Sequence, residues 1–289
     1  MISKEPFVEQ ATNGQHGPES DSARDLFSLD HRTIIVTGAM GGMGVVVAKA
    51  ILQSGADVIA IDRNAEPKAS HTEDLYRAAE KSGTVVAYYQ CDISNLESTY
   101  AVFEGAVAAA RYPLRGLVNC AAIGWVGPSI SFPVEDAKRI IEVNLVGTLI
   151  CAQAAAQLVK KHNFSASFVL IASMSGYVVN KGTPNAAYAA SKAGVHQLTR
   201  NLASEWGSST DDEGPSIRVN SVSPGVIRTP MTAGVLSNGN LEHMWTEETM
   251  LKRLSAPEDY RGPIVFLLSD ASSYVTGADL LVDGGYTGW

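Results

Sequence analysis

The chain has 289 residues, of which 45% are hydrophobic and 18% charged, an ordinary soluble composition that fits one large α/β domain or two small ones. Its formal net charge of −8 argues against nucleic acid or an anionic membrane surface as a partner. No run of about 18 apolar residues is present, so we expect no membrane-spanning segment.

Three cysteines, Cys91, Cys120 and Cys151, lie in apolar segments and lack the C-x-x-C spacing of metal and redox motifs. We interpret them as buried free thiols in a reducing compartment, which makes the cytoplasm the expected location and a metal site improbable. Residues 1–25 are polar and have no apolar segment of the secretory-signal kind. We expect a flexible tail there and a single folded domain over residues 26–289.

The first predicted elements are a strand, a glycine-rich turn, a helix and a second strand. Thr33–Thr37 is a short β-branched apolar run, typical of a strand buried on both faces. It leads into TGAMGGMG at 37–44 and a helical stretch, and the apolar run DVIAI at 57–61 then ends on Asp62. This order is typical of a dinucleotide-binding unit, although the glycine spacing is not G-x-G-x-x-G.

Each glycine of this turn has a predicted task. Gly38 allows the tight turn, Gly42 lets the backbone approach a pyrophosphate, and Gly44 lets the helix pack close to the sheet. The phosphates would then meet N–H groups at the positive end of the helix. We therefore predict a bound nucleotide, while a glycine-rich stretch by itself is also compatible with a plain turn.

Asp62 bears on the choice between NAD and NADP. A carboxylate at the end of the second strand can accept hydrogen bonds from both hydroxyls of an adenosine ribose. The 2′-phosphate of NADP would bring about −1.5 to −2 charges against it, which is repulsive in a partly dry pocket. Arg63 follows immediately and is able to reduce that repulsion. We expect NAD to be preferred, with NADP as an alternative.

Further helices and strands alternate along the rest of the chain, so we predict a Rossmann-type, doubly wound parallel sheet with helices on both faces. In such sheets ligands bind beyond the carboxyl ends of the strands. The stretch 229–256 breaks the alternation, and we interpret it as a mobile flap over the substrate or an ordinary helical excursion. The expected strands are 85–91, 117–122, 168–173, 218–223 and 279–285, and the expected helices are 67–82, 95–111, 134–162 and one that ends near 206.

Tyr188 and Lys192 are four residues apart and therefore share one face of the last of these helices. A free phenol titrates near ~10, and a neighbouring ammonium would lower that pKa, so that the tyrosine exchanges a proton with a substrate hydroxyl or carbonyl. The hydroxyls of Ser173 and Ser175 are candidates to hold the same oxygen. Such a pair is also common on helix surfaces, so the prediction depends on the nucleotide motif upstream.

Five motifs in order resemble those of the short-chain dehydrogenase/reductase family over nearly all of residues 30–289. They are the glycine turn, Asp92 after the third strand, NCAA at 119–122, the Tyr188/Lys192 pair and SPG at 223–225. The family usually has NNAG where this chain has NCAA, so Ala122 replaces a glycine. The resemblance implies an NAD(P)-dependent enzyme that interconverts a secondary alcohol and a ketone by hydride transfer.

The resemblance also implies roles for individual residues. Tyr188 would be the acid/base, Lys192 would lower its pKa and bind the nicotinamide ribose, and Asn144 would hold a water in the proton relay. Ser173, at the end of a strand, is the preferred catalytic serine and Ser175 the alternative. The implied cofactor contacts are Gly38, Met40, Gly42, Met43, Gly44, Asp62, Asp92 at the adenine ring, Ile93, Asn119, Tyr188, Lys192, Pro224, Gly225, Ile227 and, at the carboxamide, Thr229.

Residues 173–195 and the ending VDGGYTGW resemble the fungal polyol and ketose dehydrogenases that act on arabinitol, mannitol and sorbose. The segment KGTPNA at 181–186 departs from that branch and borders the expected substrate site. A secondary-metabolite or other hydrophobic alcohol is therefore an alternative substrate, and a non-catalytic nucleotide-binding scaffold is an alternative function. A homo-dimer or homo-tetramer is implied by the resemblance alone.

Overall fold

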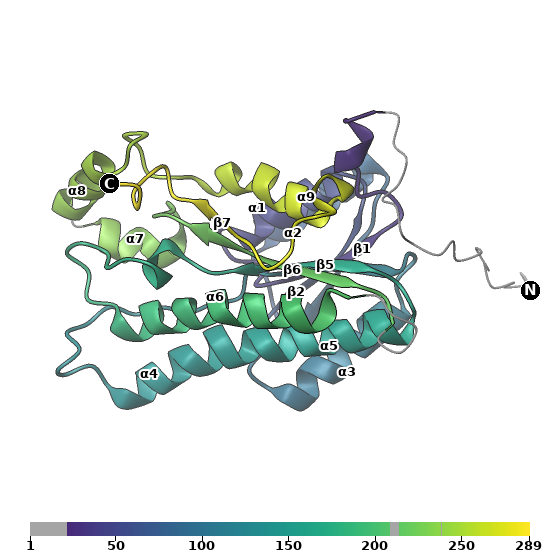
Figure 1. Ribbon diagram of the computed structural model, residues 1–289, viewed down its shortest axis with the longest axis horizontal. Helices are drawn as coiled ribbons and strands as arrows, with labels where there is room; N and C mark the ends of the chain where they lie inside the picture. Colours follow the sequence, from purple (N-terminus) through teal and green to yellow (C-terminus); the bar gives the residue numbers. More distant parts are fainter. Residues whose placement is uncertain (1–21, 209–213, 238) are drawn as a thin grey trace, which may run out of the picture.

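A computed structural model of the protein describes residues 22–208, 214–237 and 239–289. The predicted tail over residues 1–25 lies outside this range except for residues 22–25. Residues 22–24 lead into a short 3-10 helix, η1 (Asp25–Phe27). The described chain folds around one seven-stranded sheet in which every neighbouring pair is parallel (Figure 1).

The strand order is β3-β2-β1-β4-β5-β6-β7, so the sheet grows outward in two directions from β1. The point where the order reverses lies between β1 and β4, and ligands of doubly wound sheets bind at such a point. The strands are β1 (Thr33–Thr37), β2 (Asp57–Asp62), β3 (Val86–Gln90), β4 (Leu114–Asn119), β5 (Ala166–Ile171), β6 (Ile217–Pro224) and β7 (Asp279–Val282).

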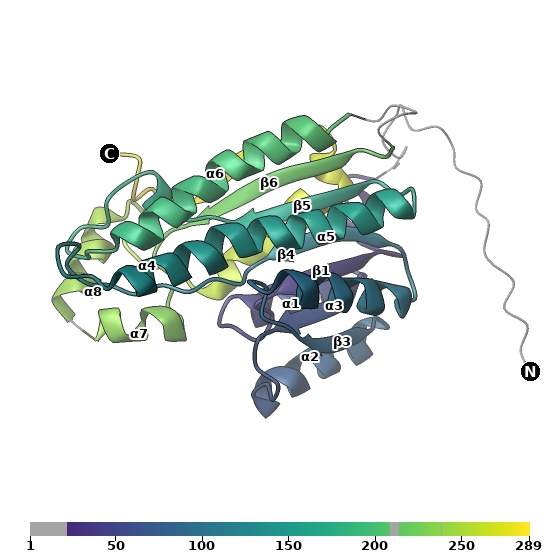
Figure 2. The same ribbon diagram turned by 90° about the horizontal axis from the view of Figure 1, so that it is seen from below.

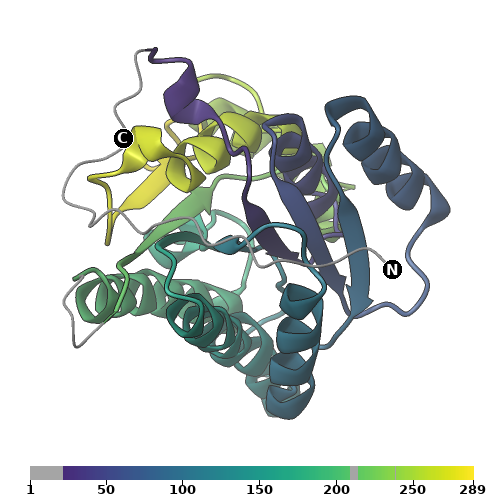
Figure 3. The same cartoon turned by 90° about the vertical axis from the view of Figure 1, so that its right-hand side faces the viewer.

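Helices cover both faces of the sheet, and Figure 3 shows them above and below the strands. The strand β1 illustrates why: Ile35 packs into the hydrophobic cluster under one face, while Ile34 and Val36 pack into the cluster under the other. Alternate side chains of a strand point to opposite faces, so a strand with apolar residues throughout needs a helical layer on each side. One layer is α3 (Leu96–Ala108), α5 (Gly147–Lys161) and α6 (Ala186–Trp206); the other is α1 (Gly44–Gln53), α2 (Ala69–Ser82) and α9 (Arg261–Leu268).

The predicted long helix near 134–162 is present but is not uniform. It consists of α4 (Val134–Ile141), a π-helical turn η2 (Glu142–Val146) and α5. Its length of 28 residues and the mean hydropathy of 1.3 over its most apolar 18 residues would suit a membrane span, but 61% of that 18-residue window is buried inside the protein. The apolar residues therefore belong to a core helix packed on the sheet.

Two further helices, α7 (Pro230–Leu236) and α8 (Gly239–Glu248), form most of the predicted flap. Figures 1 and 2 both show them together at one end of the molecule, beside the beginning of α6. The remaining 3-10 turns are η3 (Met174–Gly176), η4 (Pro257–Tyr260) and η5 (Asp270–Ser272).

Three strand ends were predicted wrongly: the expected strands at 168–173 and 279–285 end earlier, at Ile171 in β5 and at Val282 in β7, and the third is at 117–122. The expected strand at 117–122 is β4, which begins three residues earlier and ends at Asn119. The run Cys120–Ala122 is as apolar as the strand, which is why the pattern extended the prediction, but these residues leave the sheet and line a pocket.

Candidate active site

A pocket of about 870 Å³ opens at the carboxyl ends of the strands. This volume is in the range of cofactor and ligand sites, about 300–1,000 Å³. At one end its wall is the glycine turn after β1 with Asp62 at the end of β2. At the other end the wall is formed by η3, the loop before α6, and the helices α7 and α8.

The glycine turn has the close contacts that the sequence predicts. Gly38 has a φ of +61°, and a Cβ placed on it would lie 2.7 Å from Cα of Ala121. A Cβ on Gly44 would lie 2.0 Å from the carbonyl oxygen of Gly38, so only glycine fits where α1 begins. No side chain caps the N-terminus of α1, and its first residue, Gly44, lines the pocket.

Gly42 has a neighbour that the sequence did not indicate. A Cβ there would lie 2.9 Å from Cδ of Pro230 and 3.0 Å from Cβ of Thr229. The missing side chain therefore leaves room for the beginning of α7 as well as for a ligand. Both Met40 and Met43 line the pocket beside this turn.

Asp62 lies at the pocket wall, where its Oδ2 accepts a hydrogen bond from the backbone N–H of Met40 at 3.1 Å. His71 Nδ1 donates to the carbonyl oxygen of the same methionine at 3.0 Å. Arg63 and Lys68 also line this end. The carboxylate is thus held in position next to basic side chains, so the local charge is mixed rather than purely negative.

Asp92 is engaged by protein groups on both oxygens. Its Oδ2 pairs with Arg139 at 2.7 Å, and its Oδ1 accepts from the Ser94 hydroxyl at 2.7 Å. Despite partial burial, these hydrogen bonds and the guanidinium charge hold the pKa of Asp92 below its usual value. Asp92 and Ile93 both line the pocket, so an adenine contact would use a carboxylate that is already bound to Arg139.

Asn119 lies behind the pocket wall rather than on it. Its Oδ1 accepts from the Thr37 hydroxyl at 2.6 Å, and its Nδ2 donates to the Thr148 hydroxyl at 2.8 Å. The amide therefore connects β1, β4 and α5, and any effect on a cofactor passes through Cys120, the next residue. Cys120 does line the pocket, and burial raises the pKa of its thiol to about 12.

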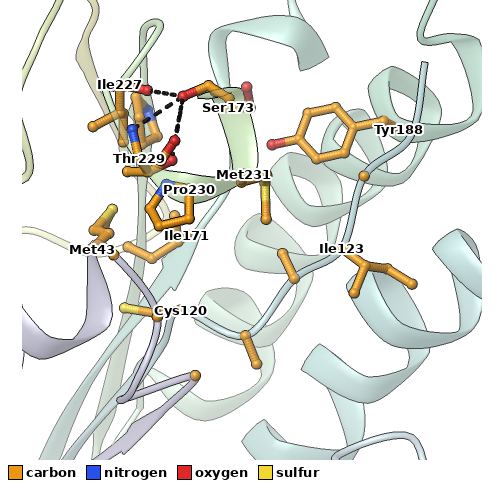
Figure 4. Close-up of a pocket in the computed structure, with 18 of the residues that line it drawn as sticks. Met43, Cys120, Ile123, Ile171, Ser173, Tyr188, Ile227, Thr229, Pro230 and Met231 are labelled. Carbon is orange, nitrogen blue, oxygen red and sulfur yellow. Dashed lines mark hydrogen bonds between the residues drawn. The ribbon is translucent and has the colours of Figure 1, made fainter. Parts of the chain in front are cut away.

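Tyr188 and Lys192 enter the pocket together from α6. Figure 4 shows the Tyr188 ring directed into the cavity, with its hydroxyl toward the side on which Ser173 and Met231 lie. The Lys192 Nζ is buried, donates to the carbonyl oxygen of Ile171 at 2.7 Å and lies 5.7 Å from the centre of the Tyr188 ring.

The pKa of Tyr188 does not follow the sequence prediction. Burial raises it above 10.0, and hydrogen bonding to Ser173 only partly counters that effect. The Lys192 ammonium donates to the carbonyl oxygen of Ile171, and burial lowers the pKa of Lys192 itself to about 8. The expectation that the protein alone would produce an acidic phenol is therefore wrong.

The two candidate serines have different partners. Ser173 accepts from the backbone N–H of Ser175 at 3.1 Å and is the serine that hydrogen bonds to Tyr188. The Ser175 hydroxyl donates to Oδ1 of Asn180 at 2.9 Å and accepts from Ser173 at 3.1 Å. Ser173 is therefore next to the phenol, and Ser175 lies one hydrogen bond further away.

Asn144 lies in the π-helical turn η2 and is fully buried. Its side chain pairs with both backbone groups of Ile123, at 2.8 and 2.9 Å, and its Nδ2 also donates to the Ser191 hydroxyl at 3.0 Å. π-helical turns inside α-helices often occur at functional sites. Here the turn positions an amide that joins the loop after β4 to the helix of Tyr188.

The end of β6 and the segment after it bring Pro224, Gly225, Ile227 and Thr229 to the pocket wall. Thr229 is the N-cap of α7, and its backbone N–H donates to the Thr232 hydroxyl at 3.1 Å, one of the bonds drawn in Figure 4. The turn at the start of α7 is thereby fixed beside Gly42.

Several pocket residues carried no sequence signal. Arg139 and His71 lie on helices whose exposed faces look ordinary in the sequence, and only the fold directs them toward the pocket. Thr183 had a partial signal, because it lies in the segment that departs from the polyol branch. Its buried Oγ1 has no hydrogen-bond partner, a state that costs roughly 1–3 kcal/mol.

In the described part of the chain, no three His, Cys, Asp or Glu side chains gather as a metal site would require.

A family model described as "Enoyl-(Acyl carrier protein) reductase" matches residues 38–287. A relative from Aspergillus versicolor, "Short chain dehydrogenases/reductase notP'", is 45% identical over 98% of this chain and 96% of its own length. The chain belongs to the short-chain dehydrogenase/reductase family. The family and enzyme class predicted from the sequence are thus confirmed, and the protein is an NAD(P)-dependent oxidoreductase that acts on an alcohol or ketone group.

Other similar proteins carry more specific names. An "NADH-dependent L-xylulose reductase" from Ambrosiozyma monospora is 38% identical over 91% of this dehydrogenase/reductase and 97% of its own chain. A "D-arabinitol 2-dehydrogenase [ribulose-forming]" from Candida tropicalis is 36% identical over 93% of this chain and 97% of its own length. A solved structure, an NADPH-dependent 3-quinuclidinone reductase from Rhodotorula rubra, aligns with a TM-score of 0.82 and 31% identity. The alignment covers 98% of this chain and 99% of the reductase.

The residues of the dehydrogenase/reductase fit the dinucleotide that the family implies. The turn from Gly38 to Gly44 offers backbone without side chains at its glycines, and no side chain caps the N-terminus of α1. Asp62 presents a carboxylate where a ribose would lie in a dinucleotide-binding unit. The distant end of the same pocket carries Tyr188, which places the proton-transfer group in the same cavity.

Proposed function

We propose that the enzyme interconverts a secondary alcohol of a polyol and the corresponding ketose, with NAD as its preferred cofactor. The observation that carries this proposal is the grouping of Tyr188, Ser173 and Lys192 at one end of a pocket that begins at the glycine turn. The relatives named for L-xylulose and D-arabinitol support the substrate class.

The proposed roles follow from the contacts. A bound nicotinamide would accept or supply the hydride. Tyr188 exchanges a proton with the substrate oxygen, and Ser173 holds that oxygen by a hydrogen bond. Lys192 keeps a positive charge near the phenol, and its pKa of about 8 lets it take part in proton exchange near neutral pH. Asn144 acts as a positioning residue, because it joins the loop at Ile123 to α6.

For the cofactor, Asp62 supports NAD, since a 2′-phosphate would be brought close to its carboxylate. The nearby side chains of Arg63, Lys68 and His71 would reduce that repulsion, so NADP remains the alternative. The relatives include one named as NADH-dependent and one as NADPH-dependent.

The decisive experiment replaces Tyr188 with phenylalanine and measures both turnover and cofactor affinity. We expect turnover of a polyol and ketose panel to fall by about 10³-fold or more, because the proton donor is lost. The affinity for NADH, measured by calorimetry, should stay within about twofold. If the variant kept most of its activity, Tyr188 would not be the acid/base.

A second candidate substrate is a hydrophobic alcohol or ketone. The flap side of the pocket carries Met231, Val235, Leu241 and Trp245, and a bicyclic ketone reductase has the same fold. Initial rates on polyols, ketoses and bulky apolar ketones, each with NAD(H) and NADP(H), separate the two. Turnover of none of them with cofactor still bound would favour a nucleotide-binding scaffold.

We also propose a homo-dimer or homo-tetramer in the cytoplasm. The strand β7 forms an open edge of the sheet, and Leu281 and Trp289 near it are exposed. Free cysteines suit a reducing compartment. Light scattering tests the oligomeric state, which a monomeric mass would contradict, and a fluorescent fusion imaged in cells tests the location.

We further propose that residues 26–289 unfold as one domain, with a flap over 229–256 that moves on binding. A second calorimetric transition would contradict the single domain.

A further inference from the structure

The substrate end of the pocket contains one buried hydroxyl that the protein leaves unpaired. Across residues 22–208, 214–237 and 239–289, three buried side-chain polar atoms lack a hydrogen-bond partner: Nε of Arg115, Oγ1 of Thr183 and Oδ2 of Asp279. Of these residues only Thr183, which is 8% exposed, lines the pocket. Buried hydroxyls in proteins are nearly always paired, so a partner from outside the chain is expected.

The loop that carries Thr183 is fixed on several sides. The Trp245 indole N–H donates to the carbonyl oxygen of Lys181 at 2.9 Å, and the Lys181 ammonium pairs with Glu248 at 2.7 Å. On the other side of Thr183, the carbonyl oxygen of Pro184 accepts from the backbone N–H of Gly127 at 2.9 Å. These bonds tie the loop to α8 and to the loop after β4. The backbone on either side of Thr183 is therefore held in place before any substrate binds.

Thr183 is separate from the hydroxyl network at the reacting oxygen. That network runs from Ser173 through Ser175 to Oδ1 of Asn180, and each of its hydroxyls has a protein partner. The Thr183 backbone N–H donates to the carbonyl oxygen of Asn180 at 3.1 Å, but its Oγ1 joins no bond of the network. The pocket wall thus carries one hydroxyl network assigned to the reacting oxygen. It also carries the Thr183 hydroxyl, to which no role is assigned so far.

We infer that Oγ1 of Thr183 hydrogen bonds to a substrate oxygen other than the one that reacts, and thereby selects hydroxylated substrates over their deoxy analogues. This inference rests on the proposed function and names the residue that recognises its substrate class. A hydroxylated substrate pairs the Thr183 hydroxyl, whereas a methylene in the same place leaves it unpaired in a dry site. Sites with a buried polar group discriminate strongly in this direction.

The test compares Thr183→Val and Thr183→Ser on two substrates, a pentulose and 2-pentanone, with saturating NADH. Valine keeps the shape of threonine but removes the hydroxyl. We expect Thr183→Val to lower kcat/KM for the pentulose by about 10-fold, mostly through KM, and to leave that for 2-pentanone within about twofold. Thr183→Ser should keep most of the preference, because the hydroxyl is retained.

A structural role would give a different result. Thr199→Val is the matched control, because Thr199 is buried and its hydroxyl already donates to the carbonyl oxygen of Val195 at 2.8 Å. The control should lower the melting temperature without changing the substrate ratio. Thr183→Val should leave the melting temperature unchanged or raise it, since no protein hydrogen bond is lost.

An unchanged pentulose/pentanone ratio in Thr183→Val, whether both rates fall or neither does, would overturn the inference. Failure of the proposed function is distinguishable from this. If the wild type reduced no ketose but reduced another ketone, the polyol proposal would fail. The ratio would then be measured on that ketone and its α-hydroxylated analogue, and an unchanged ratio there would overturn the role of Thr183.

Discussion

Replacing Lys192 with methionine should change how the stability of the enzyme depends on pH. The Lys192 ammonium is only 2% exposed, and burial lowers its pKa from 10.5 to about 8. Below pH 8 the lysine is protonated in both the folded and the unfolded chain. Between pH 8 and 10.5 the unfolded chain binds a proton that the folded chain has released, so folding stability rises with pH.

The size of this effect follows from the pKa values. At about 1.4 kcal/mol per pH unit, the interval from about 8 to 10.5 corresponds to about 3 kcal/mol over the full range. Between pH 7.5 and pH 10 about 2 kcal/mol of it should appear. Methionine does not titrate, so the difference in unfolding free energy between wild type and Lys192→Met should shift by that amount in favour of the wild type.

Urea denaturation of both proteins at pH 7.5 and pH 10 measures the shift, and taking the difference cancels the other titrating groups. Lys160→Met is the control, because Lys160 is exposed on α5. Its replacement should change the unfolding free energy by the same amount at pH 7.5 and at pH 10. A difference for Lys192→Met that stays the same within about 0.5 kcal/mol would refute the argument that burial lowers the pKa of this lysine.

Three further predictions concern the pocket. Asp62→Ser should raise kcat/KM for NADP relative to NAD by about 10-fold or more, since the carboxylate opposes a 2′-phosphate; an unchanged ratio in initial-rate assays would contradict this. Ser173→Ala should lower kcat/KM by about 10²-fold and Ser175→Ala by less than about 10-fold, and the reverse order would make Ser175 the catalytic serine. Because burial raises the pKa of Tyr188 from that of an ordinary phenol, which is already protonated at neutral pH, its phenol stays protonated there. Ketone reduction should therefore be insensitive to the titration of Tyr188 between pH 6 and 8, whereas alcohol oxidation should accelerate as pH rises; stopped-flow rates that fell with pH in both directions would exclude this assignment.

Local pattern was sufficient for much of the fold. The strand β1 coincides with the predicted 33–37, and β2 ends on the predicted Asp62, because a short apolar run between turn residues is a local property. The same holds for Tyr188 and Lys192, whose four-residue spacing places them on one helix face wherever that helix packs. The predicted strand at 117–122 failed at its end because an apolar pattern does not distinguish a residue buried in a sheet from one that lines a pocket.

The amino-acid sequence by itself thus determined the parallel α/β architecture, the glycine turn and the pairing of Tyr188 with Lys192 on one helix face. The tertiary structure decided the pKa of Lys192, the bonds of Asn144 to Ile123 and Ser191, and the unpaired hydroxyl of Thr183. The physical reason is that burial and hydrogen-bond partners depend on segments far apart in the chain. Periodicity reports only which face of its own helix or strand a residue occupies.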